Sequence, residues 1–269
     1  MIALIPIHDQ NPTRRPAVVT YLLIAANVVV FLLEPVTFSV SGNQGTAVAE
    51  CQQIAFFRKY AAIPRELTSN EPLPFTAGPP AGANRCRAVR PDYQKIPFLS
   101  VISSMFLHGG WLHLIGNMLF LYVFGNNVED RLGRIRYLLF YLVCGYVAAY
   151  GFALTQPDST ETLVGASGAV AGVLGAYLVL YPRARVTSLV PLLLFLPIWL
   201  PAWIVLGSWF VLQWLYFQGA GMGEGSSVAF FAHVAGFVAG IVGVVLLGGL
   251  NPARRPPPPP QQARWGRYA

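Results

Sequence analysis

The chain has 269 residues, of which 55% are hydrophobic and 11% are charged, whereas an ordinary soluble domain carries about 25% charged residues. This composition argues against a soluble globular domain and is typical of a membrane protein. The formal net charge of +7 does not indicate a nucleic-acid partner, because the basic residues sort by loop instead of gathering on one soluble face.

Six stretches are apolar enough to cross a hydrocarbon core about 30 Å thick, which needs roughly 20 residues per helix. They cover residues 17–38, 111–129, 137–154, 167–181, 189–217 and 228–247. The first stretch ends in Glu34-Pro35 and not at a small-residue cleavage site, so we interpret it as a span and not as a signal peptide. We therefore expect an all-α membrane protein built as a bundle of six transmembrane helices.

The basic residues of the short loops predict the orientation of this bundle. If six helices alternate, these residues fall on one side, namely Arg14, Arg15, Arg131, Arg134, Arg136, Arg183 and Arg185, together with those of the tail. The positive-inside rule then places both termini in the cytoplasm. We expect a cytoplasmic lead-in over residues 1–16, a membrane domain over 17–250, and a Pro-rich cytoplasmic tail over 251–269. These features fit a bacterial plasma membrane and leave other membranes open.

A loop of about 60 residues, 39–97, follows the first stretch and would lie outside the cytoplasm. A connection of this length indicates an ordered or functional extramembrane element. Cys51 and Cys86 both fall in this loop. An oxidising compartment would favour a disulfide between them, and the alternative is two free thiols.

The composition of two further regions predicts their local structure. The fifth stretch contains Pro191, Pro197 and Pro201, and we expect a helix that is kinked by them. At the end of the second stretch, we expect Glu129, Asp130 and Arg131 to form a solvated or locally paired helix end.

Small residues mark one face on each of two stretches. On the fourth stretch they accompany Ser167, and on the sixth they accompany His233 at i+3 and i+7. Faces of this kind let transmembrane backbones approach closely, which would bring Ser167 and His233 to similar depths. The glycines concerned are Gly165, Gly168, Gly172, Gly236 and Gly240. The alternative is a pure packing motif in which the histidine only bridges helices.

A serine hydroxyl and an imidazole within hydrogen-bond distance form an activated nucleophile, because the imidazole can accept the serine proton. Acyl transfer also needs donors for the oxyanion. His113 and Asn117 share a helix face at i, i+4, and His108 precedes them. Together with the backbone N–H of Ser167 at a helix start, these side chains could surround an oxyanion. The alternative is a set of hydrogen bonds that only pack helices together.

Two other classes of site do not fit the sequence. The segment around Ser167 lacks the second glycine of the G-x-S-x-G elbow, and no strand precedes it. No H-E-x-x-H pattern is present, and no acidic residue lies near the three histidines in sequence. We therefore expect no metal and no cofactor.

The ordered pattern of these motifs resembles the rhomboid family of intramembrane serine proteases. The pattern consists of His108-x4-His113-x3-Asn117, Gly165-x-Ser167-Gly168 and Ala232-His233-x-x-Gly236-x-x-x-Gly240. The resemblance implies a Ser-His dyad without an aspartate, in a water-filled site that opens to the outside. By position, Ser167 would be the nucleophile and His233 the general base, with His113, Asn117, His108 and Gly168 as oxyanion or supporting residues. Its substrates would be transmembrane protein helices in the lipid bilayer.

The chain departs from the family pattern at two places. Leu99-Ser100 replaces a Trp-Arg pair, and Ala171 stands where an aromatic residue often packs on the catalytic histidine. We therefore expect His233 to be held less firmly. The alternatives to a protease are a catalytically inactive rhomboid-like protein that binds or escorts membrane clients, and a channel or transporter.

Overall fold

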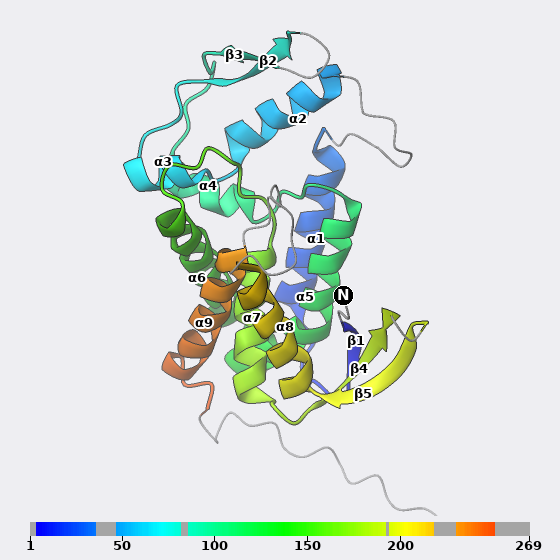
Figure 1. The fold of residues 1–269 in the computed structure, drawn as a ribbon. Helices are drawn as coiled ribbons and strands as arrows, with labels where there is room; N and C mark the ends of the chain where they lie inside the picture. Colours follow the sequence, from blue (N-terminus) through cyan, green and yellow to red (C-terminus); the bar gives the residue numbers. More distant parts are fainter. Residues whose placement is uncertain (1–3, 36–46, 82–85, 192–193, 218–229, 251–269) are drawn as a thin grey trace, which may run out of the picture.

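The computed structural model describes residues 4–35, 47–81, 86–191, 194–217 and 230–250. This part of the chain is mostly helical (Figure 1). In chain order its elements are β1 (Ile5–Asp9), α1 (Val18–Leu33), α2 (Ala47–Tyr60), α3 (Pro64–Ser69), β2 (Thr76–Pro80), β3 (Cys86–Val89), α4 (Pro97–Ser104), α5 (Trp111–Leu132), α6 (Arg134–Thr155), α7 (Ser167–Leu180), β4 (Arg185–Val190), β5 (Leu196–Pro201), α8 (Ala202–Phe217) and α9 (Phe230–Leu246). The predicted tail, 251–269, lies outside the described residues.

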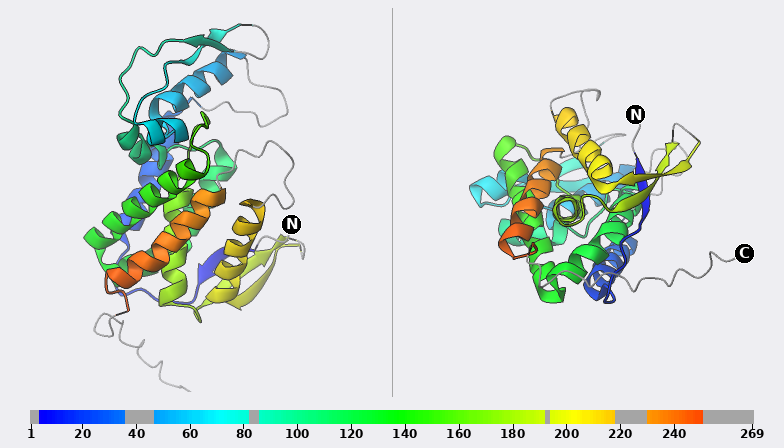
Figure 2. Two further views of the ribbon diagram at one scale, coloured as in Figure 1. Left: turned by 60° about the vertical axis from the view of Figure 1, so that its left-hand side comes forward. Right: turned by 90° about the horizontal axis from the view of Figure 1, so that it is seen from below.

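Helix α7 forms the centre of the bundle. Seen end-on in the right-hand view of Figure 2, it is surrounded by the other long helices. Every residue from Ala169 to Tyr177 is buried. A helix that is apolar all round is stable only when it is covered on all sides, and α7 carries no charge that would need solvent.

The helices differ in their capacity to cross a membrane. By length and composition, α6 can do so, and it has 22 residues. Four further apolar helices of the described part are shorter, covering Val18–Leu33, Ser167–Leu180, Ala202–Tyr216 and Phe230–Leu246. Together with α5 and α6, each of them lies within or overlaps one of the six apolar stretches of the sequence.

The prediction of one proline-kinked helix over residues 189–217 was wrong. The first part of this stretch belongs to an antiparallel hairpin of β4 and β5, and the helix begins only at Ala202. The strand order is β1-β4-β5, so β5 is an edge strand. Pro197 and Pro201 lie in β5, where the missing N–H of proline is tolerated because an edge strand has a free side.

The N-terminal lead-in is also more ordered than its composition indicates, because β1 pairs with β4. At the end of β1, Asp9 Oδ2 accepts hydrogen bonds of 2.7 Å from Asn127 Nδ2 and from the Tyr177 hydroxyl. Burial raises the pKa of Asp9, and the bond from Tyr177 partly offsets this. The sheet is therefore attached to α5 and α7 by a buried polar cluster.

The end of α5 was predicted to be solvated or locally paired, and Glu129 is neither solvated nor paired within its own helix end. This side chain is 3% exposed and accepts bonds from the N–H groups of Val19 and Thr20 at 3.0 and 2.8 Å. These N–H groups belong to the first turn of α1, which has no intrahelical partner for them. Glu129 thus caps α1 from a neighbouring helix, where a negative charge is also favoured by the helix dipole.

The described part of the loop between α1 and α5 forms an element over one end of the bundle (Figure 1). Cys51 of α2 and Cys86 at the start of β3 form a disulfide, with a Cα–Cα distance of 5.6 Å. In the chain-entropy model, closing a loop of about this length stabilises the folded state by roughly 3 to 4 kcal/mol. The disulfide joins the outer hairpin of this element to α2.

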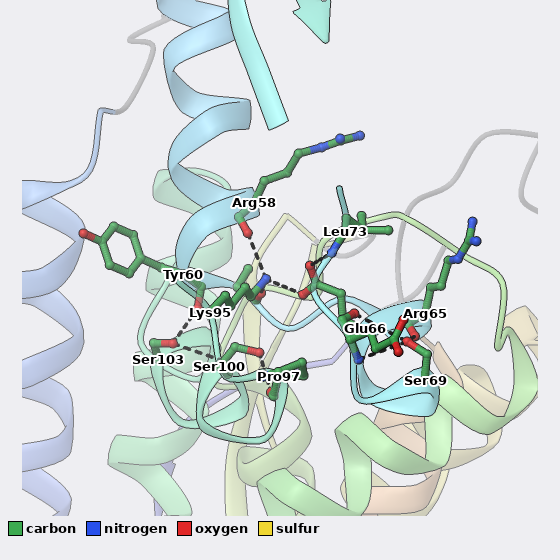
Figure 3. Close-up of polar contacts among 12 residues, drawn as sticks. Arg58, Tyr60, Arg65, Glu66, Ser69, Leu73, Lys95, Pro97, Ser100 and Ser103 are labelled. Atoms are coloured by element: carbon green, nitrogen blue, oxygen red, sulfur yellow. Dashed lines mark hydrogen bonds and ion pairs between the residues drawn. The ribbon is translucent and has the colours of Figure 1, made fainter. Parts of the chain in front are cut away.

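A buried ion pair holds the inner part of the same element together (Figure 3). Lys95 Nζ lies 2.6 Å from Glu66 Oε2, and both side chains are less than 5% exposed. Lys95 also donates to the carbonyls of Arg58 and Ala61, and Glu66 accepts a bond from the N–H of Leu73. Burial lowers the pKa of Lys95, and Glu66 partly offsets this. Buried charges need such complete pairing, because each unpaired one would cost several kcal/mol.

Helices α7 and α9 touch backbone to backbone. A methyl group added to Gly236 would overlap the carbonyl of Gly168, and one added to Gly240 would overlap the carbonyl of Gly172. A methyl group on Gly175 of α7 would in turn overlap the carbonyl of Phe237. The glycines therefore set the separation of the two helices, as small residues do at close transmembrane contacts.

We expect Gly240→Ala to lower the free energy of unfolding by about 3 kcal/mol, because the new methyl group has backbone and no movable side chain in its way. The measurement is thermal unfolding of the purified protein in detergent. Gly116→Ala is the matched control, since nothing lies within 4 Å of its added methyl group. Equal unfolding temperatures for the two variants would contradict the proposed role of Gly240.

Candidate active site

Ser167 is the first residue of α7 and is held at this position by the loop before it. The N–H of Gly165 donates to the carbonyl of Ser104 at 2.9 Å, and the N–H of Leu163 donates to that of Ala62 at 2.7 Å. Gly165 has a φ of +118°, a backbone conformation that residues with a Cβ atom rarely adopt. The N-cap residue, Ala166, makes no side-chain cap bond, so side-chain capping does not occupy the first N–H groups of α7.

His233 of α9 faces Ser167 across the close helix contact. The distance between Ser167 Oγ and His233 Nε2 is 2.8 Å. Both side chains are partly buried. Gly236, one turn further along α9, packs on the backbone of Gly168, so the glycine contact fixes the two helices next to the Ser-His pair.

The second ring nitrogen of His233 has a partner that the sequence analysis missed. Gln213 Oε1 of α8 lies 2.7 Å from His233 Nδ1. The signal was present in the sequence, because Gln213 lies in an otherwise apolar segment where polar side chains are costly and need a partner.

Aromatic rings also hold the imidazole, although Ala171 supplies none. The ring centroid of Trp209 lies 6.0 Å from that of His233, with an interplanar angle of 37°. Phe230 meets the imidazole edge-on, with its centroid at 6.5 Å. The expectation that His233 is held loosely was based on Ala171 alone, and it overlooked the rings of α8 and α9.

His113 and Asn117 of α5 lie next to the loop that precedes Ser167. A methyl group built on Gly165 would lie 2.7 Å from His113 Nε2 and 3.6 Å from Asn117 Nδ2. Asn117 is buried, and its Nδ2 has no hydrogen-bond partner among the described residues. Buried donors are usually paired, so this N–H₂ group is an exception that a reaction intermediate could satisfy.

His108 lies behind His113 and is fully buried, with 5.2 Å between the two ring centroids. Its backbone N–H donates to both carboxylate oxygens of Glu34, at 3.1 and 3.3 Å. The sequence analysis used Glu34 only as an argument against a signal peptide. In the structure its carboxylate joins the end of α1 to the start of the histidine motif.

The structure brings most of the predicted site residues to one end of the bundle. Ser167 and His233 are hydrogen-bonded, and His113 and Asn117 both lie beside Gly165, two residues before Ser167. Gly172 and Gly240 lie further along the helix contact, and the disulfide of Cys51 and Cys86 lies apart in the outer loop element. Within the described ranges, no three His, Cys, Asp or Glu side chains are grouped so that they could hold a metal ion.

The sequence of residues 97–249 matches the family model of the rhomboid domain, which is more than half of the chain. The chain belongs to the rhomboid family. Rhomboids are membrane proteins, and the resemblance inferred from the His, Ser and Gly motifs is confirmed at the level of the family.

Several rhomboid proteins are similar to this chain. RHOMBOID-like protein 4 of Arabidopsis thaliana is 33% identical over 155 residues, which are 55% of this chain and 34% of that protein. Rhomboid protein 1, mitochondrial, of Saccharomyces cerevisiae is 30% identical over 150 residues, 54% of this chain and 40% of that protein. RHOMBOID-like protein 5 of Arabidopsis thaliana is 40% identical over 78 residues, 29% of this chain and 25% of that protein.

The chain therefore spans less than half of the length of these curated relatives. Similar proteins occur in a plant, a yeast and Bacillus subtilis, so the comparison does not select a bacterial membrane over others. The rhomboid domain matches the segment from α4 to the end of α9, which contains the whole His, Ser and Gly pattern.

We expect Gly165→Ala to lower the free energy of unfolding by about 2 kcal/mol and to displace His113, because its positive φ is strained for alanine and its methyl group meets the imidazole. Thermal unfolding measures the first effect. Labelling of Ser167 by a fluorophosphonate measures the second and should fall at least tenfold. Gly109→Ala is the matched control, since its methyl group would make only an ordinary contact with His113, at 3.9 Å. Equal labelling of both variants would contradict this expectation.

Proposed function

We propose that this rhomboid is an intramembrane serine endopeptidase that cuts transmembrane protein substrates with a Ser-His dyad. The observation that carries the proposal is the 2.8 Å distance between Ser167 Oγ and His233 Nε2. Family membership supports it, because members of the rhomboid family act on transmembrane protein substrates in the bilayer. No cofactor takes part in the proposed reaction.

The dyad can perform both halves of a peptide hydrolysis. Ser167 Oγ attacks the scissile carbonyl carbon while His233 Nε2 accepts the hydroxyl proton. His233 then gives this proton to the amine as the C–N bond breaks, which leaves an ester on Ser167. Water attacks the ester, its proton passes to His233, and cleavage of the C–O bond returns the proton to Ser167. Protons and bonds balance without another reactant.

The oxyanion of each step needs donors in a site of low polarity. Asn117 Nδ2 is a buried N–H₂ group without a hydrogen-bond partner among the described residues, and His113 lies beside it. The first N–H groups of α7, with no side-chain cap, supply further donors at a helix N-terminus. We assign His113 and Asn117 to the oxyanion site, and Gly168 to the N-terminal turn that contributes backbone N–H groups. His108 supports His113 from behind.

The length of α7 supports a site below the membrane surface. Its 14 residues correspond to about 21 Å at 1.5 Å per residue, whereas the hydrocarbon core is about 30 Å thick. If the end of α7 that leads to Arg183 and Arg185 lies at the cytoplasmic surface, Ser167 lies roughly 10 Å inside the opposite surface. The disulfide of Cys51 and Cys86 belongs to the loop element over the Ser167 end, which suits an oxidising side.

In this proposed orientation both termini lie in the cytoplasm. The site lies within a bundle of six membrane-spanning helices and opens to the opposite side of the membrane. A substrate helix cannot offer its carbonyls to Ser167 while they are bonded within the helix. The substrate must therefore unwind near its exposed end, and residues that destabilise helices favour this step.

We expect the full chain in detergent to cut a model single-pass transmembrane substrate, and Ser167→Ala and His233→Ala to lower kcat at least about 10⁴-fold, because both members of the dyad are needed for proton transfer. Product formation is followed by gel or mass spectrometry, with thermal unfolding as the control for folding. Equal cutting by all three preparations would indicate a contaminating protease. A wild type that fails to cut a substrate cleaved by an established rhomboid protease would favour a client-binding protein without catalysis.

We expect Asn117→Ala to lower kcat by about 10²- to 10³-fold, because one oxyanion donor is lost. The same change should leave the unfolding temperature unchanged or raise it, because it removes a buried donor that lacks a partner. Asn27→Ala is the matched control, since Asn27 is also buried but donates to the carbonyl of Leu23 in its own helix. It should leave kcat unaffected. A kcat within twofold of wild type for Asn117→Ala would refute the assignment.

A further inference from the structure

His233 is the one histidine of the site for which the structure records hydrogen-bond partners at both ring nitrogens within the described residues. Nε2 faces Ser167 of α7 at 2.8 Å, and Nδ1 faces Gln213 Oε1 of α8 at 2.7 Å. A carbonyl oxygen can only accept a hydrogen bond, so Nδ1 carries the proton and donates it to Gln213. The lone pair of Nε2 is then directed at the Ser167 hydroxyl, which is the form that a general base requires.

We propose that Gln213 is a positioning residue that fixes the tautomer and the orientation of His233 and so completes a Ser-His-Gln arrangement. In a Ser-His-Asp triad the third residue performs this task from Nδ1. Here the neutral amide of Gln213 accepts the hydrogen bond from Nδ1. It orients the imidazole without adding a negative charge inside the bundle. This inference rests on the proposed serine protease function.

The helix that carries Gln213 also holds the face of the imidazole. Trp209 lies one turn before Gln213 on α8, with its ring centroid 6.0 Å from that of His233. The ring centroid of Trp209 also lies 6.0 Å from that of Phe237 of α9 and 6.4 Å from that of Phe120 of α5. Residues at i and i+4 lie on the same helix face, so α8 presents a ring and an amide to His233 together. The position of α8 therefore determines whether the base is aligned.

A purely structural role for Gln213 would be a hydrogen bond that only joins α8 to α9. The two roles differ in their dependence on the chemistry of the side chain. A structural bond affects stability and the fraction of folded enzyme, whereas a positioning bond affects kcat and its pH dependence in enzyme that is fully folded. Glutamate separates them, because its carboxylate keeps the acceptor at Nδ1 and adds a negative charge that favours the imidazolium form.

The experiment measures kcat, KM and the pH dependence of kcat/KM for cleavage of the model transmembrane substrate by the full chain in detergent. The variants are Gln213→Leu, Gln213→Glu and, as a matched control on the exposed side of the same helix, Val211→Ala. Thermal unfolding of each variant is recorded in parallel. Wild-type cleavage and its loss in Ser167→Ala first establish the proposed function on its own, and a wild type without activity would overturn that function and this inference with it.

We expect Gln213→Leu to lower kcat between tenfold and a hundredfold with KM within twofold of wild type, because the imidazole loses its aligning acceptor. Gln213→Glu should recover at least a third of the wild-type kcat, and its acid limb of kcat/KM, which reports the free enzyme's base, should move at least one pH unit upward. Val211→Ala should match wild type. A kcat within twofold of wild type for Gln213→Leu would overturn the proposal, as would a Gln213→Glu variant that is as inactive as Gln213→Leu and shows no shift of the acid limb.

Discussion

The backbone contact between α7 and α9 is the constraint on which the rest of the structure depends. Gly236 and Gly240 of α9 meet the carbonyls of Gly168 and Gly172 without an intervening side chain. Lipid offers no hydrophobic gain for helix association, so such contacts rely on close van der Waals packing. The contact leaves no room for a methyl group, and this fixes the distance between the two helices. Ser167 lies at the end of this contact, where a small change in separation would break its bond to His233.

Several buried charged side chains of the scaffold are hydrogen-bonded, whereas the buried amide N–H₂ group of Asn117 is not, within the described part of the chain. In the scaffold, Asp9, Glu129 and Lys95 each make several hydrogen bonds that offset the cost of burial. At the site, Asn117 Nδ2 is buried without a partner among the described residues. An unpaired donor of this kind costs stability, and it fits the proposed oxyanion site, where a charge would develop only during the reaction. Asn117 Nδ2 is one of several buried polar atoms without a hydrogen-bond partner among the described residues, and its place next to His113 and Gly165 is what distinguishes it.

Features that depend on residue spacing within one segment could be predicted from the sequence, and features that depend on a distant segment could not. The α7–α9 contact could be predicted because close approach demands small residues at regular helical spacing, and Gly236 and Gly240 show this spacing directly. The hairpin of β4 and β5 could not, because its apolar residues are compatible with either a helix or a strand. Whether this segment becomes a strand depends on β1, which lies about 180 residues earlier in the chain and pairs with β4 along its other edge.

The sequence by itself determined the apolar helices, their glycine faces and the residue types of the Ser-His pair, because each of these depends on composition and on spacing within one segment. Only the tertiary structure decided that Gln213 reaches His233, that Glu34 meets His108, and that the N–H₂ group of Asn117 has no hydrogen-bond partner among the described residues. These outcomes depend on the rotation and depth of one helix relative to another. Local periodicity leaves both free, and they are fixed only when the backbones of α7 and α9 come into contact and the remaining helices pack around them.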